Sequence, residues 1–229
     1  MIQKKTEQIN IPAPQIKILK VKIEGTSPLI FHRWNEKSKK QMLEKQMKTA
    51  ASNKAKEARD PFAEYQSSFY KDAKGFIAFP ALNIKQAIVD SARNVDGLHM
   101  TLLRGSVFVK GDMDEMIQVL HKGKPLKVSA KTKKLDGDDK PEGLFAVDSK
   151  SPEIIQMRED MVRIGNGSTD LRYRGQVKQW EMDFYIKYNE GILKADQVLN
   201  LLQISGFACG LGEWRPQRSG GFGTFEIAK

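Results

Sequence analysis

The sequence predicts an α+β fold, and three observations along its 229 residues lead to that expectation. Two long segments alternate apolar and polar residues, which is the period of a half-buried strand. Two other segments carry apolar residues at helical spacing. Along the chain, these segments follow one another in an order that indicates helices packed on one face of a sheet.

The first half of this core is expected to contain a strand, a helix and a second strand. Residues 16–25 alternate apolar residues with lysine and glutamate, so they form the first strand. Asn83 is the expected N-cap of the helix, with Gln86 three residues later, and Gly97 lies beyond its end. The segment SVFVKG, 106–111, forms the next short strand.

The second half continues with a strand, a helix and a last strand. The stretch 175–189 alternates large apolar residues, such as Trp180 and Phe184, with polar ones and is the clearest strand of the chain. A helix is expected over 194–209, and FGTFEI, 222–227, is the last strand. This order of elements is that of a ferredoxin-like (RRM-like) βαββαβ core, whose first and third strands lie side by side.

Two basic insertions are expected to enlarge this core within a single domain that spans residues 1–229. The first, about 31–75, carries nine Lys or Arg against three Glu between 31 and 59 and is expected to be a basic helical insertion. The second, about 111–160, is lysine-rich from 121 to 141, and we expect it to be partly mobile without a ligand. Such charge runs are equally typical of a solvated helix face.

The composition favours an anionic partner. The net charge of +10 and the isoelectric point near 9.5 favour nucleic acid over a small neutral substrate. One cysteine, Cys209, and three scattered histidines show no metal-ligand spacing, so neither a metal nor another cofactor is expected. No apolar stretch approaches the ~20 residues that span a bilayer, and the N-terminus has no apolar signal core. We therefore expect a cytoplasmic protein with no membrane partner.

The stretch GLGEWRPQRSGGFGTFEI, 210–227, joins the last helix to the last strand. Its glycines could turn several backbone N–H groups toward one phosphate, and Arg215 and Arg218 would add planar, charged donors. Trp214 could stack on a base. The same glycines could serve only as a tight turn, with Trp214 buried in the core.

The glycine loop resembles the signature loop of the repeat-associated mysterious protein (RAMP) superfamily, whose ferredoxin-like members form CRISPR effector backbones and guide-RNA-processing nucleases. The segment IEGTSPLIFHR, 23–33, is similar to the first strand and turn of the backbone subunits, and GEWRP resembles a group of uncharacterised bacteriophage proteins. The loop residues that carry the resemblance follow a helix end of small residues and are Gly210, Gly212, Ser219, Gly220, Gly221, Phe222 and Gly223.

The resemblance implies a non-catalytic protein that binds RNA or single-stranded DNA and assembles head to tail along the strand, in a phage or CRISPR context within a bacterial host cell. Where the family pattern matches, the resemblance nominates Ser27, His32, Gly212, Arg215, Arg218, Ser219 and Gly220.

Further contacts are expected from the residues themselves. In DLRYRG, Arg172 and Arg174 flank Tyr173, a grouping that suits a phosphate and a base, although it is equally typical of an exposed strand entry. Lys20 and Lys22 would point out from the open face of the sheet. The full expected set of nucleic-acid contacts is Lys20, Lys22, Ser27, His32, Arg33, Arg172, Tyr173, Arg174, Gly212, Trp214, Arg215, Arg218, Ser219 and Gly220.

Two other functions remain open. Processing nucleases of the RAMP superfamily share the glycine loop and use a histidine to move a proton, so the chain could be a metal-independent endoribonuclease acting through His32. A solvent-facing His32 with no chemical role is the simpler interpretation of one histidine. The third possibility is an interaction subunit that binds only protein.

Overall fold

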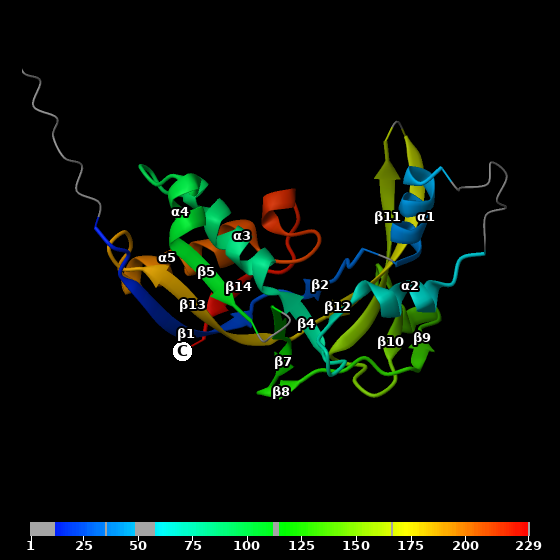
Figure 1. Ribbon diagram of the computed structural model, residues 1–229. Helices are drawn as coiled ribbons and strands as arrows, with labels where there is room; N and C mark the ends of the chain where they lie inside the picture. The colour runs from blue at the N-terminus through cyan, green and yellow to red at the C-terminus, as the bar shows by residue number, and fades with distance from the viewer. Residues whose placement is uncertain (1–11, 35, 49–57, 112–114, 166, 229) are drawn as a thin grey trace, which may run out of the picture.

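The computed structural model describes residues 12–34, 36–48, 58–111, 115–165 and 167–228 (Figure 1). The fold is α+β, as the sequence predicts, and its strands pair antiparallel in several sheets with helices packed against them. Within those ranges, no helix has the length and apolar character needed to cross a membrane.

The main sheet is built around the two clearest strand patterns of the sequence. Its strands are β1 (Ile16–Gly25), β5 (Val107–Lys110), β13 (Glu181–Asn189) and β14 (Phe225–Ile227), with the short β7 (Leu120–His121) and β8 (Lys124–Pro125) at one side. β1 pairs with β14 on one side and with β13 on the other, and β13 pairs with β5, all antiparallel. β1 and β13 therefore lie side by side, as expected.

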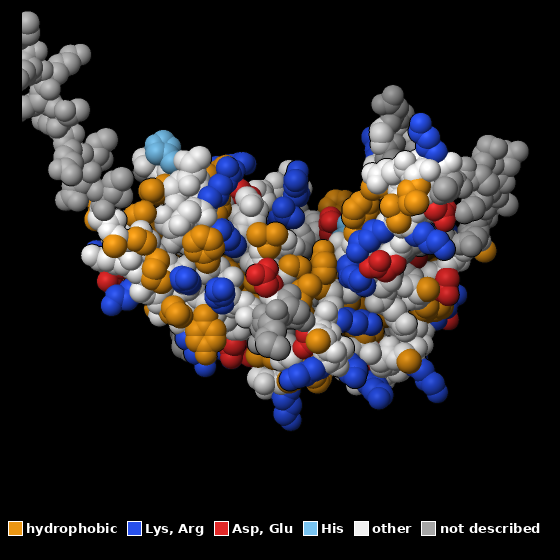
Figure 2. Space-filling model, in the orientation of Figure 1, with side chains coloured by type: hydrophobic (Ala, Val, Ile, Leu, Met, Phe, Trp, Pro, Cys, Tyr) orange, Lys and Arg blue, Asp and Glu red, His pale blue; other side chains and the backbone are white. Residues whose placement is uncertain are grey.

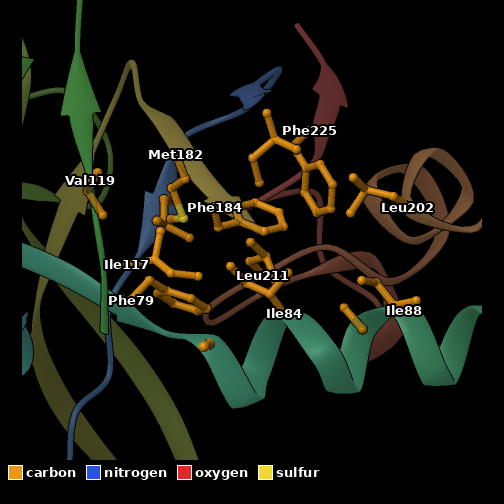
Figure 3. Packing of buried hydrophobic residues seen from close by; sticks show 14 of the residues in the cluster. Phe79, Ile84, Ile88, Ile117, Val119, Met182, Phe184, Leu202, Leu211 and Phe225 are labelled. Atoms are coloured by element: carbon orange, nitrogen blue, oxygen red, sulfur yellow. The ribbon is translucent and has the colours of Figure 1, made fainter. Parts of the chain in front are cut away.

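Three helices lie over one face of the main sheet (Figure 1): α3 (Ala81–Ser91), α4 (Met100–Ser106) and α5 (Ala195–Ile204). The alternation of β1 buries Val21 and Ile23 on that face, and β13 buries Phe184 there. In Figure 3 the Phe184 side chain lies among apolar residues that include Ile84 of α3 and Leu202 of α5. Each Å² of apolar surface removed from water contributes about 25 cal/mol, which holds the helices on this face. No described helix covers the other face.

The ends of two helices differ from the sequence prediction. α3 begins at Ala81 with Pro80 at its N-cap, and not after Asn83, because the strand β4 (Ile77–Pro80) runs directly into the helix. Proline has no N–H to leave unpaired and its fixed φ suits a helix start. α5 ends at Ile204 and continues as a π-helical turn, Ser205–Cys209.

A second lobe is formed by a five-stranded sheet and two helices (Figure 1). Its helices are α1 (Glu36–Gln46) and α2 (Pro61–Ser68), and its strands are β2 (Leu29–Ile30), β9 (Thr132–Lys134), β10 (Leu144–Asp148), β11 (Ile155–Ile164) and β12 (Ser168–Val177). A small sheet of β3 (Tyr70–Lys71), β4 and β6 (Met116–Gln118) lies between the lobes. α2 packs on β12, where a Cβ at Gly175 would overlap the Phe69 ring.

Both predicted insertions contribute to the second lobe. α1 and α2 come from 31–75, and β9 and β10 come from 111–160. The two segments touch where the Gln66 side-chain amide donates to the carbonyl of Ala130 over 3.2 Å. The mobility expected for 121–141 stays a prediction.

The boundary between β12 and β13 lies within a stretch that the sequence pattern assigned to one strand. β12 ends at Val177 and β13 begins at Glu181, because Trp180 turns inward and its indole N–H donates to the Ser27 carbonyl over 2.8 Å. DLRYRG therefore lies inside β12 and is not an entry to β13.

Candidate nucleic-acid interface

His32 lies at the centre of the candidate site. The residue before it, Phe31, is buried, and its N–H donates to the Gly175 carbonyl over 2.8 Å. The N–H of Arg33, the residue after it, donates to the Ser68 carbonyl over 2.8 Å. The first bond continues the β2–β12 pairing past the end of β2, and the second ties the chain to the end of α2, so the backbone on both sides of His32 is fixed.

Two hollows lie on either side of His32, and together they are called the His32 cleft. In Figure 2 the surface is hollowed between the lobe of α3 to α5 and the lobe of α1 and α2, with Lys and Arg side chains on the α1–α2 side. The larger hollow, of about 400 Å³, is lined by His32, Arg33, Trp34, Gln41, Arg59, Glu64, Ser67, Ser68, Arg172, Tyr173 and Arg174.

The larger hollow brings together two groups of predicted contacts that lie far apart in the sequence. His32 and Arg33 follow β2, whereas Arg172, Tyr173 and Arg174 come from β12. Because β2 pairs with the end of β12, the fold places both groups on one wall. Guanidiniums beside an aromatic ring can contact phosphates and a base, so this wall can hold a nucleotide.

Carboxylates already hold most guanidiniums of the larger hollow in position. Arg59 donates to both oxygens of Glu64 (2.8 and 2.7 Å) and to Asp170 (2.6 Å). Its hydrogen bond with Glu64 raises the pKa of Arg59. Arg172 Nε lies 3.0 Å from the other Asp170 oxygen, and Arg33 pairs with Glu36 at 2.6 Å. The arginines are therefore fixed in orientation, but their charge is largely compensated.

Arg174 is the exception, because it is buried with donors left over. Only 6% of Arg174 is exposed, and its Nη1 lies 3.6 Å from Asp160 Oδ2. The other carboxylate oxygen, Asp160 Oδ1, lies 3.1 Å from Arg158 Nη2. Within the described residues, Nε and Nη1 of Arg174 have no hydrogen-bond partner. Arg174 and the largely buried Arg158 therefore share the Asp160 carboxylate, and Arg174 keeps donors that a phosphate oxygen could accept from.

The smaller hollow, of about 170 Å³, lies between α3 and the glycine loop and is lined by His32, Tyr70, Phe79, Asn83, Gln86, Ala87, Asp90, Gly210, Leu211, Gly212, Glu213, Arg215 and Gln217. A chain of hydrogen bonds fixes its floor. The two Asp90 oxygens accept from the amides of Gln86 (2.9 Å) and Gln217 (2.7 Å). Arg215 donates to Gln217 (3.1 Å) and to the Gly212 carbonyl (2.9 Å).

A histidine–glutamate pair joins the two hollows. His32 Nδ1 lies 2.7 Å from Glu213 Oε1, and both side chains are partly exposed. This hydrogen bond is the main reason why the pKa of Glu213 is lowered, and the positive charges of Arg174 and Arg215 add to the effect. Glu213 therefore stays ionised and holds the imidazole in one orientation.

The N–H groups of the glycine loop close the loop on itself. Those of Ser219, Gly220 and Phe222 donate to the carbonyls of Pro216 (2.9 Å), Arg215 (3.1 Å) and Trp214 (3.0 Å). A Cβ at Gly220 would overlap the Trp214 carbonyl, so this glycine is needed for the close approach. These three N–H groups are therefore not free to form the phosphate nest that the sequence suggested.

The remaining predicted residues lie outside the two hollows. Trp214 is 39% exposed, with φ at 54°, and Arg218 and Ser219 are exposed on the same loop. The Ser27 hydroxyl accepts from the N–H and the hydroxyl of Thr224 (2.9 and 2.8 Å), which ties the first turn to the segment before β14. Lys20 and Lys22 lie on the uncovered face of the main sheet.

Among the cleft residues that the sequence did not nominate are Trp34, Glu213 and Arg59. Trp34 directly follows the nominated His32–Arg33 pair, so its position alone could have suggested it. Glu213 lies inside the glycine loop, and its contact with His32 joins segments that are 181 residues apart. Arg59 meets Asp170 only through the fold, since the two are 111 residues apart.

Comparisons with known proteins give a weak structural similarity. No protein-family model matches the chain, and no curated protein matches it. Among solved structures, the chain is similar to the crystal structure of Cmr6 from Pyrococcus furiosus, with a TM-score of 0.39 and 11% identity over 94% of this chain and 100% of that one. Within the described residues, no group of His, Cys, Asp and Glu side chains could hold a metal ion.

Proposed function

We propose that this chain is a non-catalytic protein that binds single-stranded nucleic acid, RNA or single-stranded DNA, in the His32 cleft. One observation carries the proposal: the fold gathers basic and aromatic residues from the segment after β2, from β12 and from the glycine loop around one partly exposed histidine. Single-strand binders combine guanidiniums that follow the backbone with aromatic side chains that stack on bases.

Two aromatic side chains of the larger hollow suit the bases. Trp34 is 51% exposed. Tyr173 is held from behind by Phe145, with ring centroids 5.5 Å apart, and the Arg59 guanidinium lies 5.7 Å from its ring centre. A ring fixed in this way loses little conformational entropy when a base stacks on it. Stacking tolerates every base, so we propose little sequence preference.

We further propose that the main sheet and its helices are a ferredoxin-like core. The supporting observation is the order β1, α3, β5, β13, α5, β14 along the chain, combined with β1 between β14 and β13 in the sheet. We also propose that copies assemble head to tail along the strand, in a phage or CRISPR context in the bacterial cytoplasm. A contact between unlike surfaces repeats without closing and gives filaments or large rings.

The test compares Arg172→Ala with the control Lys134→Ala. Both cations are partly exposed and each pairs with an aspartate, but only Arg172 lines the cleft. Arg172→Ala should weaken the binding of labelled RNA or DNA oligonucleotides about tenfold, as expected for the loss of one charge-assisted contact. Equal affinity of both variants and the wild type would reject the cleft, and no affinity at low salt would favour a subunit that binds only protein.

The His32–Glu213 pair favours a second candidate, a metal-independent endoribonuclease. A carboxylate bound to Nδ1 orients the imidazole and leaves Nε2 as a general base for a ribose hydroxyl. Tyr70 lines the same hollow, and burial is the main cause of the rise in its pKa. The candidates separate on labelled RNA in EDTA: the enzyme cleaves it and loses cleavage in His32→Ala, whereas the binding protein leaves the RNA intact.

A further inference from the structure

The face of the main sheet opposite α3 and α5 carries exposed aromatic and basic side chains. No described helix or strand covers this face (Figure 1), and the residues that point to it alternate with the buried ones along β1, β13 and β5. Tyr185 is 49% exposed there and Phe108 is 41% exposed. Tyr185 lies on β13 between two strands, and Phe108 lies on the edge strand β5. Large aromatic side chains at this exposure indicate a contact surface.

The strand register arranges these side chains in two rows. In the first row, Tyr185 of the central strand β13 lies opposite Lys20 of β1 on one side and Lys110 of β5 on the other. In the second row, Lys187 lies between Ile18 and Phe108. Neighbouring strands are about 4.8 Å apart, so each aromatic ring has an ammonium group within reach. We call these six residues the Tyr185 face.

The lysines of the Tyr185 face differ from the cations of the His32 cleft. Within the described residues, no carboxylate forms an ion pair with Lys20, Lys110 or Lys187. In the cleft, by contrast, Arg33, Arg59 and Arg172 are each paired with a carboxylate. The nearest paired lysine, Lys22, lies in the next row and contacts Glu181 at 2.8 Å. Unpaired cations attract an anion without displacing a partner.

The two rings do not offer the same surface. The ammonium of Lys85, on α3, lies 3.9 Å from the centre of the Phe108 ring, so that ring already has a cation at one face. Within the described residues, no ring or cation contact is formed by Tyr185. Tyr185 is therefore the main stacking platform of this face, with Phe108 beside it.

We propose that the Tyr185 face is a second contact site for the single strand, where a base stacks on Tyr185 and phosphates lie against Lys20 and Lys110. The choice of partner rests on the proposed function. A protein partner would have to bury three unpaired lysines, which is costly unless it supplies carboxylates, whereas a strand supplies one phosphate per nucleotide. Lys20, which the sequence predicted as a nucleic-acid contact, then binds a phosphate. The proposal adds Tyr185, Phe108, Lys110 and Lys187 to the predicted nucleic-acid contacts.

The test uses Tyr185→Ala, with Tyr185→Phe as the conservative variant and Phe207→Ala as the matched control. Phe207 is 81% exposed on the π-helical turn, away from this face. Tyr185→Ala should weaken single-strand binding by roughly 5- to 150-fold, whereas Tyr185→Phe and Phe207→Ala should bind as the wild type does. The double variant Lys20→Gln, Lys110→Gln should lower the log–log salt slope by about 1.4, whereas Lys150→Gln, an exposed lysine elsewhere, should change it by no more than about 0.7.

The outcomes separate this inference from the function it rests on. If the wild type binds no oligonucleotide, both fall. If Arg172→Ala weakens binding and Tyr185→Ala does not, only the Tyr185 face is overturned and the His32 cleft stands. If Tyr185→Ala changes the sedimentation of the free protein and leaves its affinity for oligonucleotides intact, the face contacts protein and the inference is likewise overturned.

Discussion

Replacing Arg174 by methionine should weaken nucleic-acid binding with little change in the stability of the fold. Arg174 and Arg158 flank the Asp160 carboxylate; the Arg174 side chain is buried, and those of Arg158 and Asp160 are largely buried. Arg158 donates to Asp160 over 3.1 Å and to Gln176 over 3.0 Å, with only its Nε lacking a partner within the described residues, whereas both Nε and Nη1 of Arg174 lack one. Methionine has a similar length and would leave a neutral Arg158–Asp160 pair.

The magnitudes follow from which charge is left unpaired. Arg174→Met should lower the free energy of unfolding by no more than about 1 kcal/mol, because replacing an incompletely paired buried ion by an apolar side chain is often neutral or stabilising. Asp160→Asn is the contrasting variant: it leaves two buried guanidiniums without an anion and should cost about 3–5 kcal/mol. If Arg174 reaches a phosphate, Arg174→Met should weaken binding at least about tenfold.

Two measurements on the same preparations test this reasoning. Urea denaturation gives the free energy of unfolding, and fluorescence anisotropy with a labelled oligonucleotide gives the affinity of the folded protein. A loss of more than about 2 kcal/mol of stability in Arg174→Met, with the affinity at the wild-type value, would contradict this expectation. Arg174 would then be a structural residue of the β11–β12 hairpin.

Three further results are expected. The double variant Arg215→Ala, Arg218→Ala should weaken binding to all sequences and reduce the log–log salt slope by up to about 1.4, which a salt titration measures; an unchanged slope with an intact fold would exclude these contacts. Residues 121–141 should be cut readily by protease in the free protein and protected once an oligonucleotide is bound, and equal cutting in both states would contradict this. The hydrogen bond from His32 lowers the pKa of Glu213, so this pair stabilises the folded state above the unfolded pKa of about 4.3 and ceases to do so as the pH falls through the folded value. Glu213→Gln should therefore show a smaller loss of stability than the wild type in urea denaturation between about pH 6 and pH 3.

Periodicity allowed β1, β13, α3 and α5 to be predicted, whereas the short elements α4, β7 and β8 were not. A strand that is buried on one face shows a period of two, as β1 and β13 do, and a helix on that face shows a period of 3.6. β12 was harder to delimit, because its central residues Arg172 and Arg174 are charged and a buried charged residue breaks the pattern. Only its pairing with β11 shows that it is a strand of its own.

Several residues of the candidate site could be predicted from the sequence, but the ion pairs and hydrogen bonds between them could not. Residue type and spacing nominated Arg172 and Arg215, since charged and aromatic residues in short groups carry a chemical signal, and the resemblance of the first turn nominated His32. Which carboxylate neutralises which cation depends on contacts between distant segments, such as His32 with Glu213, 181 residues apart. The net charge of the sequence therefore could not show that carboxylates neutralise the arginines of the cleft.

The distribution of paired and unpaired cations implies different tasks for the two surfaces. In the His32 cleft, guanidiniums held by carboxylates have fixed directions, so they select a geometry but add little long-range attraction. On the Tyr185 face, lysines without partners add attraction that salt screens, but little direction. The Tyr185 face and the His32 cleft would then bind one nucleic-acid strand as two linked sites. Their combined affinity would exceed the affinity of either site alone. Raising the salt concentration should release the sheet contact first, and the binding that persists should depend on Arg172 and no longer on Lys20.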